Sequence, residues 1–175
     1  MIRGSPVIRF SSGCIERGDA MTPAEFIAAM SGPAQAAQVK TRIPASFTVA
    51  EAALESGWGH SRLAVEAFNL FGVKADPAWL GDRIAMDTRE WSIANGWEMV
   101  PAWWRKYPDF ESCLEDHDDF LSHPRYAHCF DAANGEEFAR AVQAAGYATD
   151  PTYSDKLISI MRAHNLAALD VLPAA

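Results

Sequence analysis

Apolar residues recur every three or four positions along much of the chain, which is the spacing of amphipathic helices. The first helix is predicted to start at Pro23, because Thr22 can act as its N-cap and Glu25 can complete a capping box. The pair Gly32-Pro33 is expected to kink or split this helix, since proline lacks the N–H that a helix interior uses.

Further helices are predicted from the same spacing and from their end signals. The second opens at Pro44 and carries a wide apolar stripe, and Gly57 supplies its stop. Asn134 and Gly146 mark the two ends of a later helix. In chain order, the helices predicted after the first cover residues 44–56, 61–68, 110–122, 135–145 and 152–165.

A different pattern follows Arg83, where apolar and polar residues alternate with a period of two. That period is typical of a β-strand. Asn95-Gly96 is a strong tight-turn signal, and Trp97 to Trp104 can form the returning strand. The sequence therefore predicts an α+β fold, in which a β-hairpin lobe interrupts a mainly helical domain.

Composition and charge limit the alternatives. The chain has 175 residues, 49% apolar and 11% aromatic, which is enough for the core of one domain. We expect the folded domain at residues 21–167, with a disordered tail at 1–20 and a short tail at 168–175. A net charge of −8 repels phosphate backbones, and no apolar run approaches the ~20 residues that span a bilayer, so neither a nucleic-acid nor a membrane partner is expected.

Glu55 is the first candidate for chemistry. It lies in the last turn of an apolar helix, where the helix dipole disfavours a charged carboxylate, and the neighbouring Trp58 can exclude water. Both effects raise the pKa of the carboxyl, as a general acid near neutral pH requires. Glu51, one turn earlier, either raises the pKa of Glu55 further or faces solvent.

Several short motifs within residues 21–165 surround and follow Glu55. They comprise Ala52-Ala53-Leu54-Glu55-Ser56-Gly57-Trp58-Gly59-His60-Ser61, Leu63-Ala64, Asn69-Leu70-Phe71-Gly72-Val73-Lys74, Thr88-Arg89-Glu90, Tyr107-Pro108-Asp109-Phe110, Gly146-Tyr147-Ala148-Thr149-Asp150-Pro151, Tyr153 and Lys156. In this order they closely resemble the signature of glycoside hydrolase family 73, the bacterial, phage and flagellar-type N-acetylglucosaminidases of the lysozyme superfamily. One departure is Glu51, where glutamine is expected more often.

The resemblance implies a lysozyme-like domain that cleaves the β-1,4 bond after N-acetylglucosamine in peptidoglycan. It assigns Glu55 as the proton donor and Glu90, on the predicted hairpin, as the second acid, acting as a base or as an electrostatic partner. Asp87 is the nearest substitute for Glu90, although strand alternation aims it at the other face. Tyr153 is expected to orient the N-acetyl group of the substrate or to steady developing charge.

Aromatic and amide residues are the candidates for substrate binding. Trp58, Asn69 and Phe71 are expected to shape the cleft floor, and Tyr147 is either a sugar platform or a packing residue. Aromatic faces stack on sugar rings, although at least two of the hairpin tryptophans should lie in the core. These tryptophans are Trp91, Trp97, Trp103 and Trp104, of which Trp91 is the binding candidate.

No cofactor or metal is expected. His117, His123 and His128, with the acids around them, fit a solvated helix face better than a metal site. The cysteines Cys14, Cys113 and Cys129 are too scattered for a zinc finger or a disulfide framework, although Cys113 and Cys129 can pair in an oxidising compartment.

The first twenty residues lack the apolar core of a signal peptide. We therefore expect the protein to be made in the bacterial cytoplasm and to reach the wall by phage lysin-like export. There it is expected to act on glycan strands as an endolysin or autolysin. We also expect it to be a monomer.

Three alternatives to this function stay open. A lytic transglycosylase or muramidase of the same superfamily needs only the one helix-end glutamate. A catalytically silent wall-binding module would keep the fold without the chemistry. A peptide-bond hydrolase would use Cys113 with His117, but Cys113 lies within a helix rather than at the helix N-terminus where thiolates are favoured.

Overall fold

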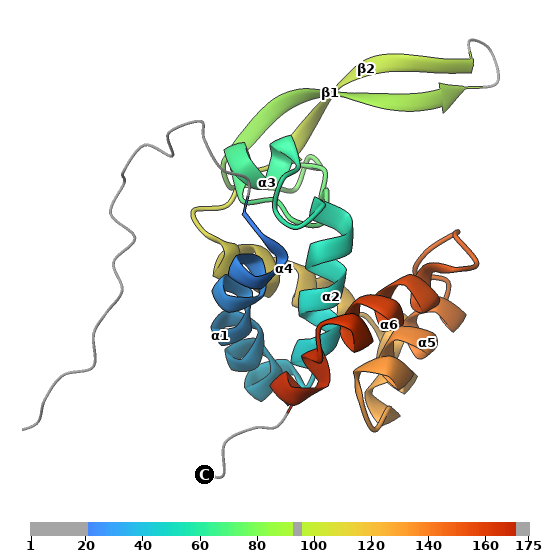
Figure 1. Ribbon diagram of the computed structural model, residues 1–175. Coiled ribbons are helices and arrows are strands. Elements are labelled where there is room, and N and C mark those ends of the chain that lie inside the picture. The colour runs from blue at the N-terminus through green and yellow to red at the C-terminus, as the bar shows by residue number, and fades with distance from the viewer. Residues whose placement is uncertain (1–20, 93–95, 171–175) are drawn as a thin grey trace, which may run out of the picture.

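A computed structural model describes residues 21–92 and 96–170, the side chains of residues 89–92 excepted. The tail expected at 1–20, the last five residues of the tail expected at 168–175, and the turn residue Asn95 lie outside the described residues. The elements are α1 (Pro23–Thr41), α2 (Ala45–Ser56), α3 (Arg62–Ala67), β1 (Arg83–Ser92), β2 (Gly96–Arg105), α4 (Phe110–Leu121), the 3-10 helix η1 (Pro124–Asp131), α5 (Gly135–Ala144), α6 (Tyr153–Ala163) and the 3-10 helix η2 (Leu166–Asp170). The helices form one body, from which the hairpin projects (Figure 1).

Helix α1 begins with the predicted capping box. The Glu25 N–H donates to Thr22 Oγ1 at 3.3 Å, and the Thr22 N–H donates to Glu25 Oε2 at 2.8 Å. Gly32-Pro33 was expected to kink or split the helix, and the split was wrong, because α1 continues through Pro33 to Thr41. Its buried face packs on α2 and α4, and this packing outweighs the missing hydrogen bond. That face consists of Phe26, Met30, Ala34 and Ala37.

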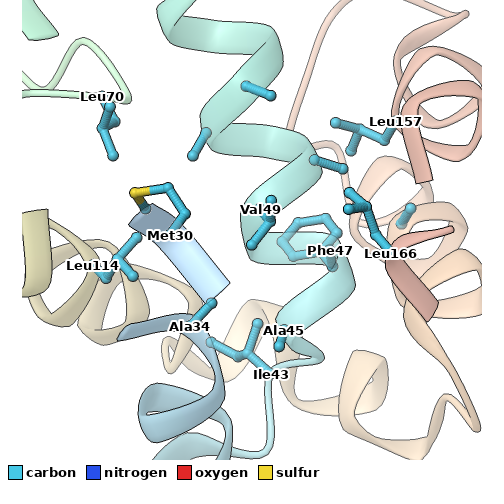
Figure 2. Close-up of a cluster of buried hydrophobic side chains, with 14 of the residues drawn as sticks. Met30, Ala34, Ile43, Ala45, Phe47, Val49, Leu70, Leu114, Leu157 and Leu166 are labelled. Atoms are coloured by element: carbon cyan, nitrogen blue, oxygen red, sulfur yellow. The ribbon is translucent and has the colours of Figure 1, made fainter. Parts of the chain in front are cut away.

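Helix α2 is the centre of the core. Of its twelve residues, all but Leu54 and Glu55 are buried. Met30 and Leu114 lie on one side of it and Leu157 and Leu166 on the other (Figure 2). A helix enclosed in this way gives its last turn a fixed position, which matters for the residue that the last turn carries.

The start of α2 is capped from the far end of the chain. Its N-cap, Pro44, has no side-chain hydrogen bond to offer. Instead, the Asp170 carboxylate accepts hydrogen bonds from the backbone N–H of Ser46 at 2.8 Å and from its hydroxyl at 2.7 Å. The boundary expected after residue 167 therefore falls inside η2, whose last residue holds the central helix.

The hairpin has the predicted antiparallel pairing, from Arg83 opposite Arg105 to Ser92 opposite Gly96. At least two of its four tryptophans were expected to lie in the core. The side chains of three are described, and one of these three is buried. Trp104 is buried, and its indole N–H donates to the Met86 carbonyl at 3.1 Å. Trp97 and Trp103 are 62% and 53% exposed, and strand alternation places both on the face of β2 opposite to that of Trp104.

The remaining helices, α3 to α6, match the predicted segments to within about two residues at each end. The two 3-10 helices were not anticipated. Among the described residues, no helix is both long enough and apolar enough to pass through a bilayer.

Candidate active site

Glu55 stands where α2 ends. Gly57 takes a left-handed conformation, with φ of 58°, and its N–H donates to the Ala53 carbonyl, so the helix ends at Ser56, the residue directly after Glu55. The Glu55 side chain then reaches a cavity of about 390 Å³. The cavity is lined by Glu55, Phe71, Val73, Arg105, Asp116, His117, Phe120, Tyr147, Ala148 and Tyr153.

The surroundings of Glu55 raise the pKa of its carboxyl. The main cause is burial of the carboxyl within the cavity wall, although the residue as a whole is exposed, and the second is the negative charge of Glu51. The Tyr153 hydroxyl, His117 and Lys156 act in the opposite direction but do not cancel the rise. The direction expected from the sequence is therefore the one found.

A chain of buried polar groups lies behind Glu55. Tyr153 donates its hydroxyl hydrogen to Glu51 Oε1 at 2.9 Å, and Glu51 Oε2 lies 3.5 Å from His117 Nε2. The same His117 nitrogen lies 2.9 Å from the Tyr147 hydroxyl. The Phe71 ring stacks on the His117 ring, with centroids 3.9 Å apart and an angle of 18° between the planes. Five side chains from distant segments thus form one unit.

Glu51 and His117 act as an ion pair in this unit. Burial by itself would raise the pKa of Glu51, but the charge of His117 and hydrogen bonds from His117, Tyr147 and Tyr153 hold it below the usual value. Burial would likewise lower the pKa of His117, whereas the charge and hydrogen bond of Glu51 raise it. Each partner therefore keeps the other charged where neither meets water.

The structure brings four of the predicted site residues together. Glu55, Phe71, Tyr147 and Tyr153 all line the one cavity. Phe71 and Tyr147 present aromatic surface, and Tyr153 presents a hydroxyl beside the carboxyl. A pocket with an apolar wall and one acid of raised pKa is a typical candidate for a catalytic site.

Two predicted residues lie elsewhere. The Trp58 ring packs on Phe26 and His164, at centroid distances of 6.0 and 4.8 Å, and does not line the cavity. Asn69 is buried, and its amide bonds the backbone of Val73 and Arg105. Asn69 thus joins the loop before the hairpin to the end of β2, and a direct role in substrate binding stays a prediction for it and for Trp58.

The second candidate acid is placed by its backbone alone. Glu90 lies in β1 opposite Glu98, and Trp91 lies opposite Trp97. The side chains of Glu90 and Trp91 are outside the described residues, so their roles stay predictions. Asp87, the substitute for Glu90, is exposed on β1.

Sequence reasoning missed the groups behind Glu55. The expectation of a solvated helix face was wrong for His117 and Asp118, which are buried in α4, and Glu51 does not face solvent. The available signal of burial was that His117 and Asp118 share one face of α4 with Cys113, Leu114 and Leu121. The described residues contain no group of three or more His, Cys, Asp or Glu side chains arranged to hold a metal ion.

The cysteine alternative does not fit the geometry. Cys113 and Cys129 are both free and fully buried. Burial raises the pKa of the Cys113 thiol to about 12, so the thiolate that a peptidase needs does not form. His117, four residues further on, is engaged with Glu51 instead.

A larger cavity, of about 480 Å³, lies where the hairpin joins the helices. Its walls include Trp79, Asp82, Lys106 and Tyr107. Asp82 is the one carboxylate residue among its lining residues, whereas the smaller cavity holds Glu55, the carboxyl whose pKa is raised. The smaller cavity is therefore the candidate active site.

A helical body with a two-stranded lobe, and a cavity holding one acid at the end of the central helix, defines a lysozyme-like glycosidase domain. The family described as Glucosaminidase, mannosyl-glycoprotein endo-beta-N-acetylglucosaminidase, matches residues 31–166. The chain belongs to this family, and the resemblance to glycoside hydrolase family 73 and the α+β fold class are confirmed. The name of that family describes a glycoside hydrolase.

Relatives and solved structures agree with this assignment. The chain is 39% identical over 142 residues to the peptidoglycan hydrolase FlgJ of Escherichia coli K12, covering 78% of this chain and 45% of that protein. It is 37% identical over 151 residues to the exo-glucosaminidase LytG of Bacillus subtilis, covering 83% and 52%. The chain thus spans about half the length of these curated relatives.

The catalytic domain of the autolysin Auto from Listeria monocytogenes superimposes with a TM-score of 0.79 and 30% identity, covering 89% of this chain and 92% of that one. A truncated glycoside hydrolase domain of FlgJ from Salmonella typhimurium gives 0.72 and 36%, covering 82% and 98%.

Proposed function

We propose that this chain hydrolyses the β-1,4 bond that follows N-acetylglucosamine in peptidoglycan, with Glu55 as the proton donor. The observation that carries the proposal is the raised pKa of the Glu55 carboxyl at the wall of an aromatic-lined cavity. The names of the relatives, a peptidoglycan hydrolase and an exo-glucosaminidase, support the choice of substrate.

The first step follows from the protonated state of Glu55. Its proton passes to the glycosidic oxygen as the bond from that oxygen to the anomeric carbon breaks, and the bonding electrons stay with the oxygen. Positive charge develops on the anomeric carbon, and the Glu55 carboxylate remains. A water oxygen later bonds to this carbon and gives up a proton, so that a bond has been hydrolysed and Glu55 can be protonated again.

Two routes can bring in the water. In one, Glu90 acts as base or electrostatic partner, and in the other the 2-acetamido oxygen of the substrate attacks first, with Tyr153 holding that group. Inversion at the anomeric carbon requires direct attack by water, whereas the acetamido route gives retention. NMR of the product anomer immediately after cleavage therefore separates inversion from retention. A Glu90→Gln variant that keeps its rate would exclude the first route.

The cavity wall is suited to a sugar ring. Tyr147 is half-buried, and Phe71 packs on His117 with part of its surface in the cavity. Aromatic faces bind the apolar faces of sugars, while the Tyr153 hydroxyl offers a polar contact. We assign Phe71 and Tyr147 to substrate binding on this basis.

The test is digestion of purified cell wall by wild type, Glu55→Gln and Glu90→Gln, with the new ends identified by mass spectrometry. Glu66→Gln, an exposed acid on α3, is the matched control. Reducing N-acetylglucosamine ends that disappear in Glu55→Gln support the proposal.

Other products would change the assignment. Anhydro-muramic ends would indicate a lytic transglycosylase, and reducing muramic acid a muramidase. If wild type and Glu55→Gln cleared the wall equally slowly, the chain would be a silent wall-binding module.

We further propose that the chain acts outside the cytoplasmic membrane, as an endolysin or autolysin, because peptidoglycan lies there. A monomer suffices for this role, since Glu55, Phe71, Tyr147 and Tyr153 all come from one chain. Light scattering of the active protein tests the monomer, and a dimer of unchanged activity per chain would contradict it.

A further inference from the structure

Glu51 is an unusual residue to find at the centre of a domain. Its side chain is 0% exposed, it comes from the central helix α2, and its Oε2 lies 3.5 Å from His117 Nε2. An ionised carboxylate is costly to bury and persists only where partners compensate. The question is what this charge does.

We propose that the buried pair of Glu51 and His117 is a positioning device for Glu55: it anchors the Tyr153 hydroxyl beside the proton donor and sets a fixed negative charge one helical turn behind it. The inference rests on the proposed function, because it gives Glu55 the part of the acid. Glu51 and His117 themselves act through Glu55 and Tyr153.

The helix geometry places the charge. Glu51 and Glu55 are four residues apart in α2, a spacing that puts both side chains on one face about one turn apart. The Phe71 ring covers His117, and Glu51 is sealed from water, so salt and solvent screen this charge little. A like charge so placed opposes ionisation of Glu55, in agreement with the raised pKa of Glu55.

The charge of His117 offsets the cost of burying the Glu51 carboxylate without cancelling the effect of Glu51 on the pKa of Glu55. The His117 ring nitrogen faces Glu51 Oε2 and the Tyr147 hydroxyl, while the influence of Glu51 on the pKa of Glu55 exceeds that of His117. The pair can therefore be neutral as a whole and still oppose charge on Glu55. The other charged groups that face this site are Lys156 from α6, Arg105 from β2, and Asp116 and Asp118 from α4.

Tyr153 provides an opposite influence on the same carboxyl. Its hydroxyl donates to Glu51 Oε1 at 2.9 Å and also interacts with Glu55, where it lowers the pKa. Removing the Glu51 charge and removing the Tyr153 hydroxyl should thus move the titration of Glu55 in opposite directions. A purely structural role predicts something else, because loosening the site in either way would let water in and move both titrations down.

The experiment is a carbon-detected NMR titration of the Glu55 carboxyl in wild type, Glu51→Gln and Tyr153→Phe, with the signal assigned by its loss in Glu55→Gln. Glutamine keeps the shape of Glu51 and an oxygen to accept from Tyr153. We expect the Glu55 midpoint to fall in Glu51→Gln and to rise in Tyr153→Phe. In Glu51→Gln, the ratio of the wall-digestion rate at pH 7 to that at pH 5 should fall about threefold.

The control is Glu115→Gln, which removes an exposed acid of α4 that pairs with Lys40, and which should leave the Glu55 midpoint in place. A Glu55 midpoint that stays unchanged in folded Glu51→Gln, or that moves the same way in both variants, overturns the proposal. If Glu51→Gln does not fold, Tyr153→Phe decides alone, since a midpoint that falls or stays contradicts the positioning role.

The titration is independent of the substrate. If the two variants shift the Glu55 midpoint in opposite directions but the protein releases no sugar from peptidoglycan, the proposed function is refuted and the positioning role of Glu51 and His117 stands. If the protein cleaves peptidoglycan but the shifts are not opposed, the proposed function stands and the positioning role is refuted.

Discussion

Arg105 Nη1 lies 2.5 Å from Asp116 Oδ1, and this contact joins the end of β2 to α4 at the cavity wall. The other guanidinium nitrogen, Nη2, lies 2.7 Å from Asp76, and the Arg105 group stands 4.5 Å from the centre of the Trp79 ring. Tyr107 also donates to Asp116, at 2.6 Å. One arginine therefore ties the hairpin lobe to the helical body beside the candidate acid.

The two-pronged guanidinium group of Arg105 is predicted to be essential to the contact between the hairpin and the helical body. Arg105→Lys keeps the charge but can no longer hold both carboxylates and lie against Trp79 at once. We expect a loss of about 1.5–3 kcal/mol in the free energy of unfolding, measured by chemical denaturation. Arg62→Lys, which alters an exposed pair on α3, is the control and should change nothing measurable. Equal stability of Arg105→Lys and wild type would contradict the prediction.

The Glu55 carboxyl is predicted to set the basic limb of the pH profile. Because its pKa is raised by burial and by Glu51, Glu55 stays protonated above the usual value of 4.5, and activity falls as the pH passes through the raised value. Glu55→Gln should lose about a thousandfold in rate, since proton donation contributes ~10² to 10⁴. Initial rates of wall clearing across pH test this, and a basic limb at or below 4.5 would refute it.

Glu55→Gln, which should lower activity, is predicted to raise the free energy of unfolding above the pKa of Glu55. A carboxyl whose folded pKa lies above its unfolded pKa favours folding at low pH and disfavours it once ionised. Glu55→Gln should therefore be more stable than wild type at pH 8, and the difference should shrink as the pH falls. Thermal melting at both ends of the range measures it.

Asp118 is predicted to make stability fall with rising pH. Burial raises the pKa of its carboxyl to about 6 from 3.8, and neither oxygen has a hydrogen bond within the described residues. The folded chain thus binds one proton more than the unfolded chain between these values, so the stabilisation present below pH 3.8 is lost by about pH 6. Asp118→Asn should gain on the order of 1–3 kcal/mol over wild type at pH 8 and little at pH 3.5.

Urea denaturation at the two pH values measures the Asp118 effect, with the exposed neighbour Asp119→Asn as control. A gain for Asp118→Asn that did not depend on pH would rule out the buried charge as its source.

The contact between Asp170 and Ser46 is predicted to be the cap of the central helix. Asp170→Ala removes both hydrogen bonds from the start of α2, where the N-cap residue Pro44 offers none. A loss of about 1–2 kcal/mol is expected, as for other N-cap deletions. Hydrogen exchange should show the first turn of α2 opening more readily than in wild type, and unchanged protection there would exclude the capping role.

Local signals were sufficient to predict the α-helices and the hairpin, but not the two 3-10 helices. Thr22 and Glu25 capped α1, Gly57 ended α2, and the period of two from Arg83 produced the paired strands. These features depend on neighbours within a few residues, so the printed sequence contains them in full. Pro33 shows the limit of local rules, because packing against α2 and α4 kept α1 continuous across it.

The sequence by itself thus determined the α-helices, the hairpin and the candidate for the acid, since the motif around Glu55 is a run of adjacent residues. It did not determine that His117 lies inside, because burial of a polar residue depends on a partner 66 positions away, Glu51, which is contiguous only after folding. Tyr153 reaches Glu51 across 102 positions and Asp170 reaches Ser46 across 124, and no local pattern encodes such contacts. Only the tertiary structure decided which charges surround Glu55, because electrostatic interactions depend on distance in space rather than along the chain.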